Sequence, residues 1–120
     1  MILVDTSIWV EHFRSGTPRL ADELSAGRVL IHPFVTFELA CGNLRNRRGM
    51  LDLLNRLPRA PVATHDEALA FVEERALMGR GVGFVDVHLL ASTALAAPAG
   101  LWTRDKRLAA LAGELSLVSG

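Results

Sequence analysis

Four of the thirteen acidic residues stand within or directly after apolar stretches, and these are Asp5, Glu38, Asp86 and Asp105. Most of the other acids fall in stretches that read as solvated helix faces, such as Asp22-Glu23. An unpaired buried carboxylate costs several kcal/mol, so it is retained when it is paired, protonated or bound to a cation. The surroundings of the four carboxylates therefore predict a shared site.

Strand ends explain how carboxylates so far apart in sequence can meet. Asp5 follows the apolar run of residues 1–4, and Asp105 follows a second apolar run, 100–103. In a parallel sheet, ligands bind beyond the carboxyl ends of the strands. Glu38 and Asp86 lie near the starts of predicted helices that would face the same edge. Mg²⁺ or Mn²⁺ would relieve the repulsion among the four acids, and such a site serves phosphodiester hydrolysis.

Each acid taken alone also has a simpler structural explanation. Asp5 and Asp86 could cap the helices that they precede or begin, and Glu38 could pair with a nearby arginine. Asp105 could be a first-turn acid that faces a helix dipole. Their convergence on the edge where this fold binds ligands favours the shared site.

The remaining pattern alternates short apolar strands with amphipathic helices. Strands are predicted over residues 1–4, 28–32, 60–63, 100–103 and 115–118, all short and apolar. Helices are predicted from Thr6 or Ser7 to about residue 14, and over 17–27, 33–43, 49–57, 64–79, 85–96 and 104–112. Thr64 and Glu67 fit a capping box. This alternation predicts one α/β domain over residues 1–120, with a central parallel sheet flanked by helices.

Composition excludes several classes of protein. The 120 residues hold 13 Lys and Arg against 13 Asp and Glu, so a uniformly basic nucleic-acid binder is excluded. The cancellation is uneven: residues 42–62 carry a net charge of +4 and residues 63–74 carry −4. Cys41 is the single cysteine, which excludes an internal disulfide or a cysteine zinc site, and its apolar flanks predict a buried thiol.

Apolar residues make up 50% of the chain, which favours a surface covered by a partner. The acids near the start exclude a signal peptide, and the longest nearly uncharged run, 89–103, is too broken for a membrane span. We therefore expect a cytosolic protein that does not enter a membrane.

Four segments together resemble a known family. Ile-Leu-Val-Asp5-Thr6-Ser7, Glu38-Leu-Ala, Asp86-Val-His-Leu-Leu-Ala-Ser-Thr-Ala and Leu-Trp-Thr103-Arg-Asp105 are similar to the four acidic motifs of PIN-domain ribonucleases. Their order, their spacing and the chain length resemble most closely the VapC-type toxins of bacterial toxin–antitoxin pairs. The resemblance covers essentially the whole chain.

The resemblance implies a Rossmann-like sheet and a Mg²⁺- or Mn²⁺-dependent endoribonuclease. By motif position, Asp5, Asp86 and Asp105 would coordinate metal, and Glu38 would act directly or by ordering a bound water. Thr6 or Ser7 and Thr103 would hydrogen-bond these carboxylates or the scissile phosphate. The implied partners are an RNA substrate and a small VapB-type antitoxin, in a homodimer that assembles further with the antitoxin.

Other residues leave alternatives open. Arg45, Arg47 and Arg48 form a basic cluster that could be a solvated face, an RNA contact or a partner contact. Arg104 and Arg80 could steer phosphate towards the metal site, or Arg104 could pair with another carboxylate. The histidines form no spaced ligand pair, and both tryptophans, Trp9 and Trp102, are expected to pack in the core or an interface.

Two other functions compete with a ribonuclease. The first is a PIN-like module that binds RNA or protein without cutting, against which the intact acidic set argues. The second is a phosphatase or receiver domain on a similar sheet. A dehalogenase-type phosphatase needs Asp two residues after Asp5, where this chain has Ser7, and a receiver needs a late lysine that the lone Lys106 does not match.

Overall fold

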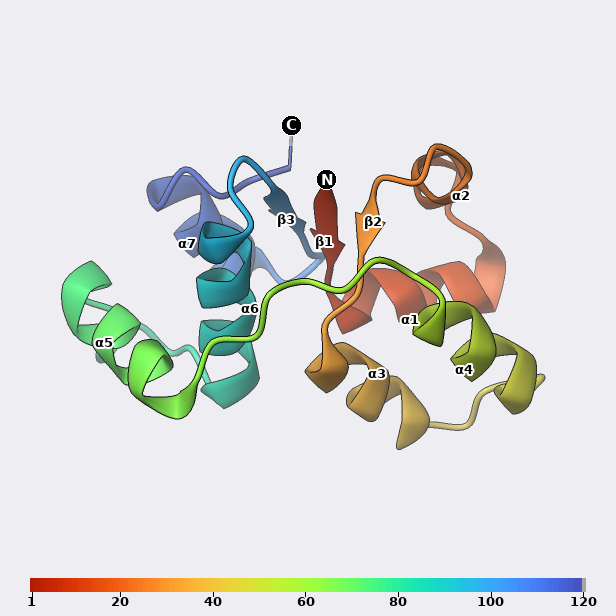
Figure 1. Ribbon diagram of the computed structural model, residues 1–120, viewed down its shortest axis with the longest axis horizontal. Coiled ribbons are helices and arrows are strands. Elements are labelled where there is room, and N and C mark those ends of the chain that lie inside the picture. The colour runs from red at the N-terminus through yellow and green to blue at the C-terminus, as the bar shows by residue number, and fades with distance from the viewer. Residues whose placement is uncertain (120) are drawn as a thin grey trace.

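Three parallel strands form the centre of the molecule (Figure 1). The computed structural model describes residues 1–119. Strand β1 (Ile2–Val4) lies between β2 (Val29–Leu30) and β3 (Gly100–Trp102), and both neighbours run parallel to it. Since parallel strands end at the same edge, the sheet brings the residues after β1 and β3 together. The predicted α/β class is confirmed.

The two outermost predicted strands are wrong in extent. Residues 60–63 form no strand, and the chain there touches the sheet through one parallel bridge between Ile31 and Arg59. Residues 115–118 likewise contribute one parallel bridge, between Leu101 and Val118. A Cβ on Gly100 would lie 2.5 Å from the Ser119 backbone, so glycine permits this close approach. The apolar sequence correctly predicted that both segments lie beside the sheet. Each segment, however, pairs with a strand of the sheet at one residue pair only.

In the described part of the chain, helices occupy seven segments: α1 (Thr6–Ser15), α2 (Pro18–Ser25), α3 (Pro33–Ala40), α4 (Arg47–Asn55), α5 (His65–Arg75), α6 (Phe84–Leu95) and α7 (Lys106–Glu114). Helices α3 and α5 end earlier than predicted, and α5 ends at Arg75 because the next residue, Ala76, has a left-handed backbone. Cys41 follows α3 directly and is exposed, so the predicted buried thiol is wrong.

Side chains cap the helices that matter for the site. Asp105 Oδ1 accepts hydrogen bonds from the backbone N–H groups of Arg107 and Leu108 at the start of α7. His32 Nδ1 accepts one from Phe34 N, 3.0 Å away, at the start of α3. The predicted capping box of Thr64 and Glu67 is present at α5. These bonds satisfy backbone donors that the first helical turn leaves unpaired.

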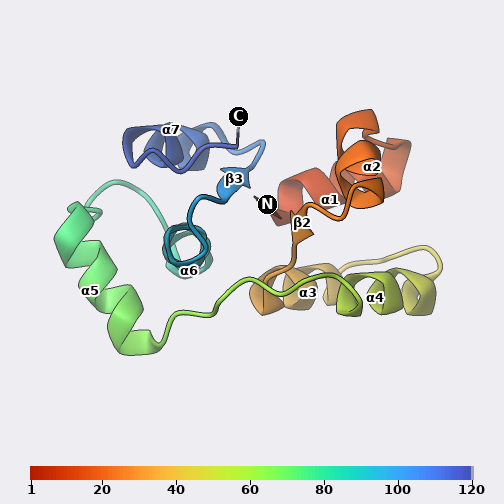
Figure 2. The ribbon, with the colours of Figure 1, turned by 45° about the horizontal axis from the view of Figure 1, so that its top comes forward.

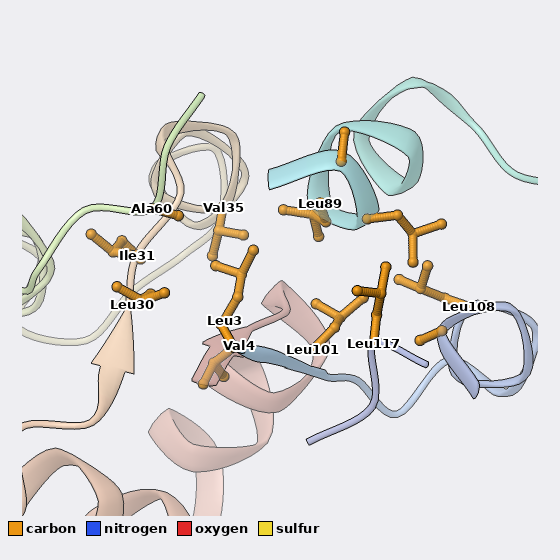
Figure 3. Packing of buried hydrophobic residues seen from close by; sticks show 14 of the residues in the cluster. Leu3, Val4, Leu30, Ile31, Val35, Ala60, Leu89, Leu101, Leu108 and Leu117 are labelled. Atoms are coloured by element: carbon orange, nitrogen blue, oxygen red, sulfur yellow. The ribbon is translucent and has the colours of Figure 1, made fainter. Parts of the chain in front are cut away.

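The core lies between the sheet and the helices that cover it (Figure 3). Leu3 on β1 and Leu89 on α6 are fully buried, and Leu101, Leu108 and Leu117 join them. The two tryptophans pack as expected: Trp9 is fully buried, and Trp102 is half-buried beneath the Arg19 guanidinium, 4.2 Å from its ring centre.

Helices α4 and α5 lie at opposite ends of the molecule (Figures 1 and 2). Helix α5 packs on α6, whereas α4 packs on α3. Within residues 1–119, no helix is both long and apolar enough to cross a membrane.

His32 makes folding sensitive to acid. Burial lowers the pKa of its imidazole from 6.5 to about 4, and the positive charge of His88 adds to this effect. Because the folded pKa is depressed, the unfolded state binds more protons below pH 6.5, and stability falls as the pH falls towards 4. We expect His32 to cost about 2 kcal/mol of unfolding free energy between pH 7.5 and pH 5.

Urea unfolding at both pH values measures this loss. His32→Asn keeps a side chain able to cap α3, and it should remove most of the pH dependence above pH 5. The exposed His65 provides the control, because His65→Asn should keep the wild-type dependence. Equal pH dependence in wild type and His32→Asn would contradict the assignment.

Candidate metal site at the carboxyl edge of the sheet

Asp5 occupies the junction between β1 and α1. Its backbone N–H donates to the Trp102 carbonyl at 2.9 Å, which ties the end of β1 to the end of β3. Its own carbonyl accepts from Ile8 N, so Asp5 also begins α1. Asp5 therefore stands at the cap position of α1, and the helix begins at Thr6, one of the two predicted starts. Its side chain makes no capping bond, and the residue is only 8% exposed.

Two hydroxyl groups hold the Asp5 carboxylate. Ser7 Oγ and Thr103 Oγ1 each donate a hydrogen bond of 2.7 Å to Asp5 Oδ2. Each hydroxyl has one proton, and both protons are directed to the same oxygen. Hydrogen bonds to a carboxylate are stronger than those between neutral groups, so this pair fixes the orientation of the side chain. Asp5 Oδ1 remains free to accept a further ligand.

The same hydroxyl groups accept bonds from the backbone after β3. Arg104 N donates to Ser7 Oγ, and Asp105 N donates to Thr103 Oγ1, each over 3.0 Å. The segment between β3 and α7 is thus bound to Asp5 through the two hydroxyls. Asp105 in turn binds this segment to α7, because its Oδ1 caps that helix. Its Oδ2 accepts no hydrogen bond within residues 1–119.

Glu38 reaches this edge from α3. Thr6 Oγ1, at the start of α1, donates a hydrogen bond of 2.6 Å to Glu38 Oε1. This bond links α3 to α1 beside Asp5 and leaves Glu38 Oε2 free. The partner of Glu38 is therefore a hydroxyl group rather than the arginine considered from the sequence.

Asp86 enters from the first turn of α6, where Gly83 rather than Asp86 occupies the cap position. Burial raises the pKa of the Asp86 carboxyl, and the negative charges of Asp5, Asp105 and Glu38 raise it further. A hydrogen bond with the Gly83 backbone acts in the opposite direction on this pKa. Asp5, Asp105 and Glu38 therefore all lie close enough to Asp86 for their charges to repel its carboxylate.

The donor set suits a hard divalent cation. It consists of carboxylate oxygens, the ligands that Mg²⁺ and Mn²⁺ prefer. Asp5, Glu38 and Asp105 each use one oxygen within the chain and keep the other free, so internal hydrogen bonds orient them without consuming their capacity as ligands. Within residues 1–119, no three acidic, histidine or cysteine side chains close around a single point.

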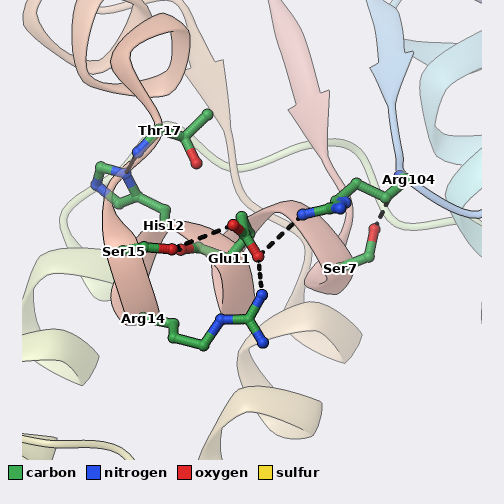
Figure 4. Close-up of polar contacts among 7 residues, drawn as sticks. All are labelled: Ser7, Glu11, His12, Arg14, Ser15, Thr17 and Arg104. Carbon is green, nitrogen blue, oxygen red and sulfur yellow. Dashed lines mark hydrogen bonds and ion pairs between the residues drawn. The ribbon is translucent and has the colours of Figure 1, made fainter.

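Arginines stand beside this edge, held by Glu11 (Figure 4). Arg104 Nη1 lies 2.9 Å from Glu11 Oε2, and Arg14 forms an ion pair with the same oxygen. Ser15 Oγ donates to Glu11 Oε1, and this bond is the largest cause that lowers the pKa of the Glu11 carboxyl. Arg104 thus pairs with a carboxylate outside the site, which was the alternative that its sequence position left open.

Glu11 is the residue that sequence reasoning missed. It reads as an ordinary helix acid, and its relation to Arg104 depends on how α1 meets the segment after β3. Only the spacing of Glu11 and Arg14, three residues apart on a helix, signals one of its two ion pairs. Arg80, the other arginine considered for phosphate steering, pairs with Glu114 at 2.8 Å.

Comparisons with known proteins matched the chain to a domain family and to a named relative. Residues 2–114 match the PIN domain family. The chain is 52% identical over 114 residues to a protein named Ribonuclease VapC32 from Mycobacterium tuberculosis, found in strains CDC 1551 / Oshkosh and ATCC 25618 / H37Rv. The match covers 95% of this chain and 92% of each relative.

Asp86 should destabilise the metal-free fold at neutral pH. Its raised pKa means that the ionised carboxylate is less favourable in the folded state than in the unfolded one, so its contribution to stability falls as the pH rises through its unfolded pKa. We expect Asp86→Asn to raise the Tm measured in EDTA at pH 7. Asp66→Asn, at an exposed position on α5, is the matched control, and a lower Tm for Asp86→Asn would contradict this account.

Thr103→Val tests the hydroxyl support of Asp5. The substitution keeps the side-chain shape and removes a bond to a carboxylate, so we expect a loss of about 1–3 kcal/mol of unfolding free energy. Thr17→Val is the control, because Thr17 Oγ1 is buried without a partner in the described chain and its removal should be neutral or stabilising. Equal effects of the two substitutions in denaturant unfolding would argue against the bond.

Proposed function

The chain belongs to the PIN domain family, and we propose that it is a Mg²⁺- or Mn²⁺-dependent endoribonuclease, the toxin of a toxin–antitoxin pair that acts in the cytosol. The observation that carries the proposal is the pinned Asp5 carboxylate with three further acids around it. The name of the 52% identical relatives supports RNA as the substrate.

Asp5, Asp86 and Asp105 are the proposed metal ligands, with Glu38 as a direct or water-mediated one. Bound there, the metal would lower the pKa of a coordinated water and polarise the scissile phosphate. Ser7 and Thr103 hold Asp5 in one orientation, and Thr6 does the same for Glu38. The roles of all three hydroxyl groups are positional, because the proton of each group is committed to a carboxylate.

Arginine side chains supply the positive charge that the acids lack. Arg104 follows Thr103 directly and is exposed at the rim of the site. Its ion pair with Glu11 is exposed enough that a phosphate oxygen can compete for the guanidinium at small cost. Arg104 would thus draw the RNA backbone towards the carboxylate edge.

Exposed apolar side chains favour the proposal that this small chain binds protein partners. Phe37 on α3 is 70% exposed and Phe84 on α6 is 63% exposed, and each lies near an acid of the site. Covering such side chains is favourable in water, so a VapB-type antitoxin and a second copy of the chain are the proposed partners.

A module that binds RNA or protein without cutting it is the second candidate. One observation favours it: within residues 1–119 the carboxylates do not close around one point. Mutual repulsion among the four charges opposes their closure, and a bound cation would offset that repulsion. Metal binding separates the two candidates.

Asp5→Asn should abolish metal binding and RNA cleavage while the fold remains intact. The amide oxygen can still accept the Ser7 and Thr103 bonds, but the charge that a cation needs is lost. For wild type, Mn²⁺ at 100 times its Kd should add about 2.7 kcal/mol of stability, a rise in Tm of roughly 10 °C. Asp5→Asn should lose this rise, and its cleavage of RNA in Mg²⁺ should fall more than about 100-fold.

The exposed Asp22 provides the control, since Asp22→Asn should keep both the Mn²⁺ shift and the cleavage. Cleavage should also stop in EDTA and return when Mg²⁺ is added in excess. Undiminished cleavage in EDTA, or by purified Asp5→Asn, would overturn the proposed mechanism. Absence of both cleavage and the Mn²⁺ shift in wild type would favour the binding module.

A further inference from the structure

A pocket of about 570 Å³ opens beside the carboxylate edge, between α1, α3 and the segment 42–46 that leads into α4. This volume falls within the roughly 300–1,000 Å³ of pockets that hold small organic groups. Figures 1 and 2 show α3 and α4 side by side, with α1 next to them.

The pocket is continuous with the proposed metal site. Thr6 and Glu38 line it, and they are the two residues joined by the 2.6 Å hydrogen bond beside Asp5. If a phosphate of an RNA strand lies at the carboxylates, the adjacent nucleotide of that strand would therefore lie at the opening of this pocket.

Apolar side chains form much of the pocket wall. Val10 is 50% exposed on α1, whereas Ile8 and Trp9 of the same helix are buried. Phe13 and Met50 also line the pocket and are only partly buried. A flat base can stack on such a surface, and aromatic and apolar walls are typical of sites for unpaired bases.

Two amides supply the polar groups. Asn43 and Asn46 line the pocket and are exposed, and no hydrogen bond joins either side chain to another group within residues 1–119. An amide offers both donors and an acceptor, so it can read the edge of a base. A residue that recognises a base needs donors and acceptors that are not already bonded to other groups of the protein.

Asn46 is held in an unusual backbone conformation. Its φ of 48° and ψ of 52° are left-handed, which is costly for most residues but tolerated by asparagine. A Cβ on Gly49 would lie 2.5 Å from Asn46 Nδ2, so the glycine leaves room for the amide against the first turn of α4. Such backbone strain in a ligand-lining residue is common at functional sites.

Positive charge at the rim distinguishes RNA from other occupants. Arg14 and Arg45 line the pocket, and Glu11 joins Arg14 to Arg104 at the carboxylate edge (Figure 4). Guanidinium groups therefore extend from the proposed cleavage site to the pocket. This charge complements a phosphate backbone on both sides of one nucleotide.

We propose that this pocket receives one unpaired base of the RNA substrate, next to the scissile phosphate, and that Asn43 and Asn46 select that base. The proposal rests on the ribonuclease function proposed above. The base stacks against the wall formed by Val10, Phe13 and Met50, while the flanking phosphates face Arg14 and Arg45.

The test compares wild type with a double variant, Asn43→Ala/Asn46→Gly. Glycine takes the left-handed backbone without strain, so this variant removes both amides and spares the fold. Asn55→Ala, at the exposed far end of α4 and outside this pocket, is the matched control. Each protein cleaves a single-stranded RNA library of random sequence in Mg²⁺, and sequencing of the products gives the base preference around the cut.

We expect wild type and Asn55→Ala to prefer one base at a position adjacent to the cut. The double variant should lose the preference at that position alone, and its KM for a preferred oligonucleotide should rise about tenfold. Unchanged preference and unchanged KM would overturn the proposal. So would a double variant that cuts like wild type but escapes inhibition by the antitoxin, because the pocket would then belong to the protein partner.

A second measurement separates this proposal from the proposed cleavage. Fluorescence anisotropy gives the Kd of a labelled single-stranded oligonucleotide in the Asp5→Asn background, where no cutting is expected. Loss of about tenfold in affinity with the double variant, and not with Asn55→Ala, supports the base pocket even if wild type fails to cleave. Equal affinities for all three proteins would overturn the pocket whether or not wild type is a nuclease.

Discussion

The repulsion among four carboxylates at one sheet edge is the constraint on which the rest of the structure depends. Asp5, Glu38, Asp86 and Asp105 come from four elements, and three of them raise the pKa of the fourth. A fold without a role for this charge would gain by replacing it with neutral side chains. The fold instead orients Asp5, Glu38 and Asp105 with internal hydrogen bonds and leaves their charge in place, as the proposed cation site requires.

Hydroxyl groups let the fold hold the acids without neutralising them. An arginine in the place of Thr103 would satisfy Asp5 electrostatically and compete with a metal, whereas Ser7 and Thr103 orient Asp5 and leave its charge. The backbone after β3 then closes over these hydroxyls. Glu11 serves a complementary purpose, since it holds Arg104 and Arg14 beside the acids rather than among them.

Local sequence signals predicted much of this arrangement. The apolar run before Asp5 placed β1, and the Thr64 capping box placed the start of α5. The outer strands were predicted to be longer than they are. An apolar sequence indicates that a segment lies beside a sheet, but it does not indicate how many of its residues pair with the sheet. Cys41 was misplaced because α3 ends one residue before it. The Glu11–Arg104 pair and the pocket beside Glu38 arise from contacts between distant segments, which no local pattern encodes.

The most direct test of the carboxylate site is an anomalous difference map from crystals grown with Mn²⁺. We expect a peak at the carboxyl edge of the sheet, about 2.1 Å from oxygens of Asp5, Asp86 and Asp105, with the Ser7 and Thr103 bonds to Asp5 retained. A map with no peak at this edge at millimolar Mn²⁺, or with a peak held by other residues, would contradict the account.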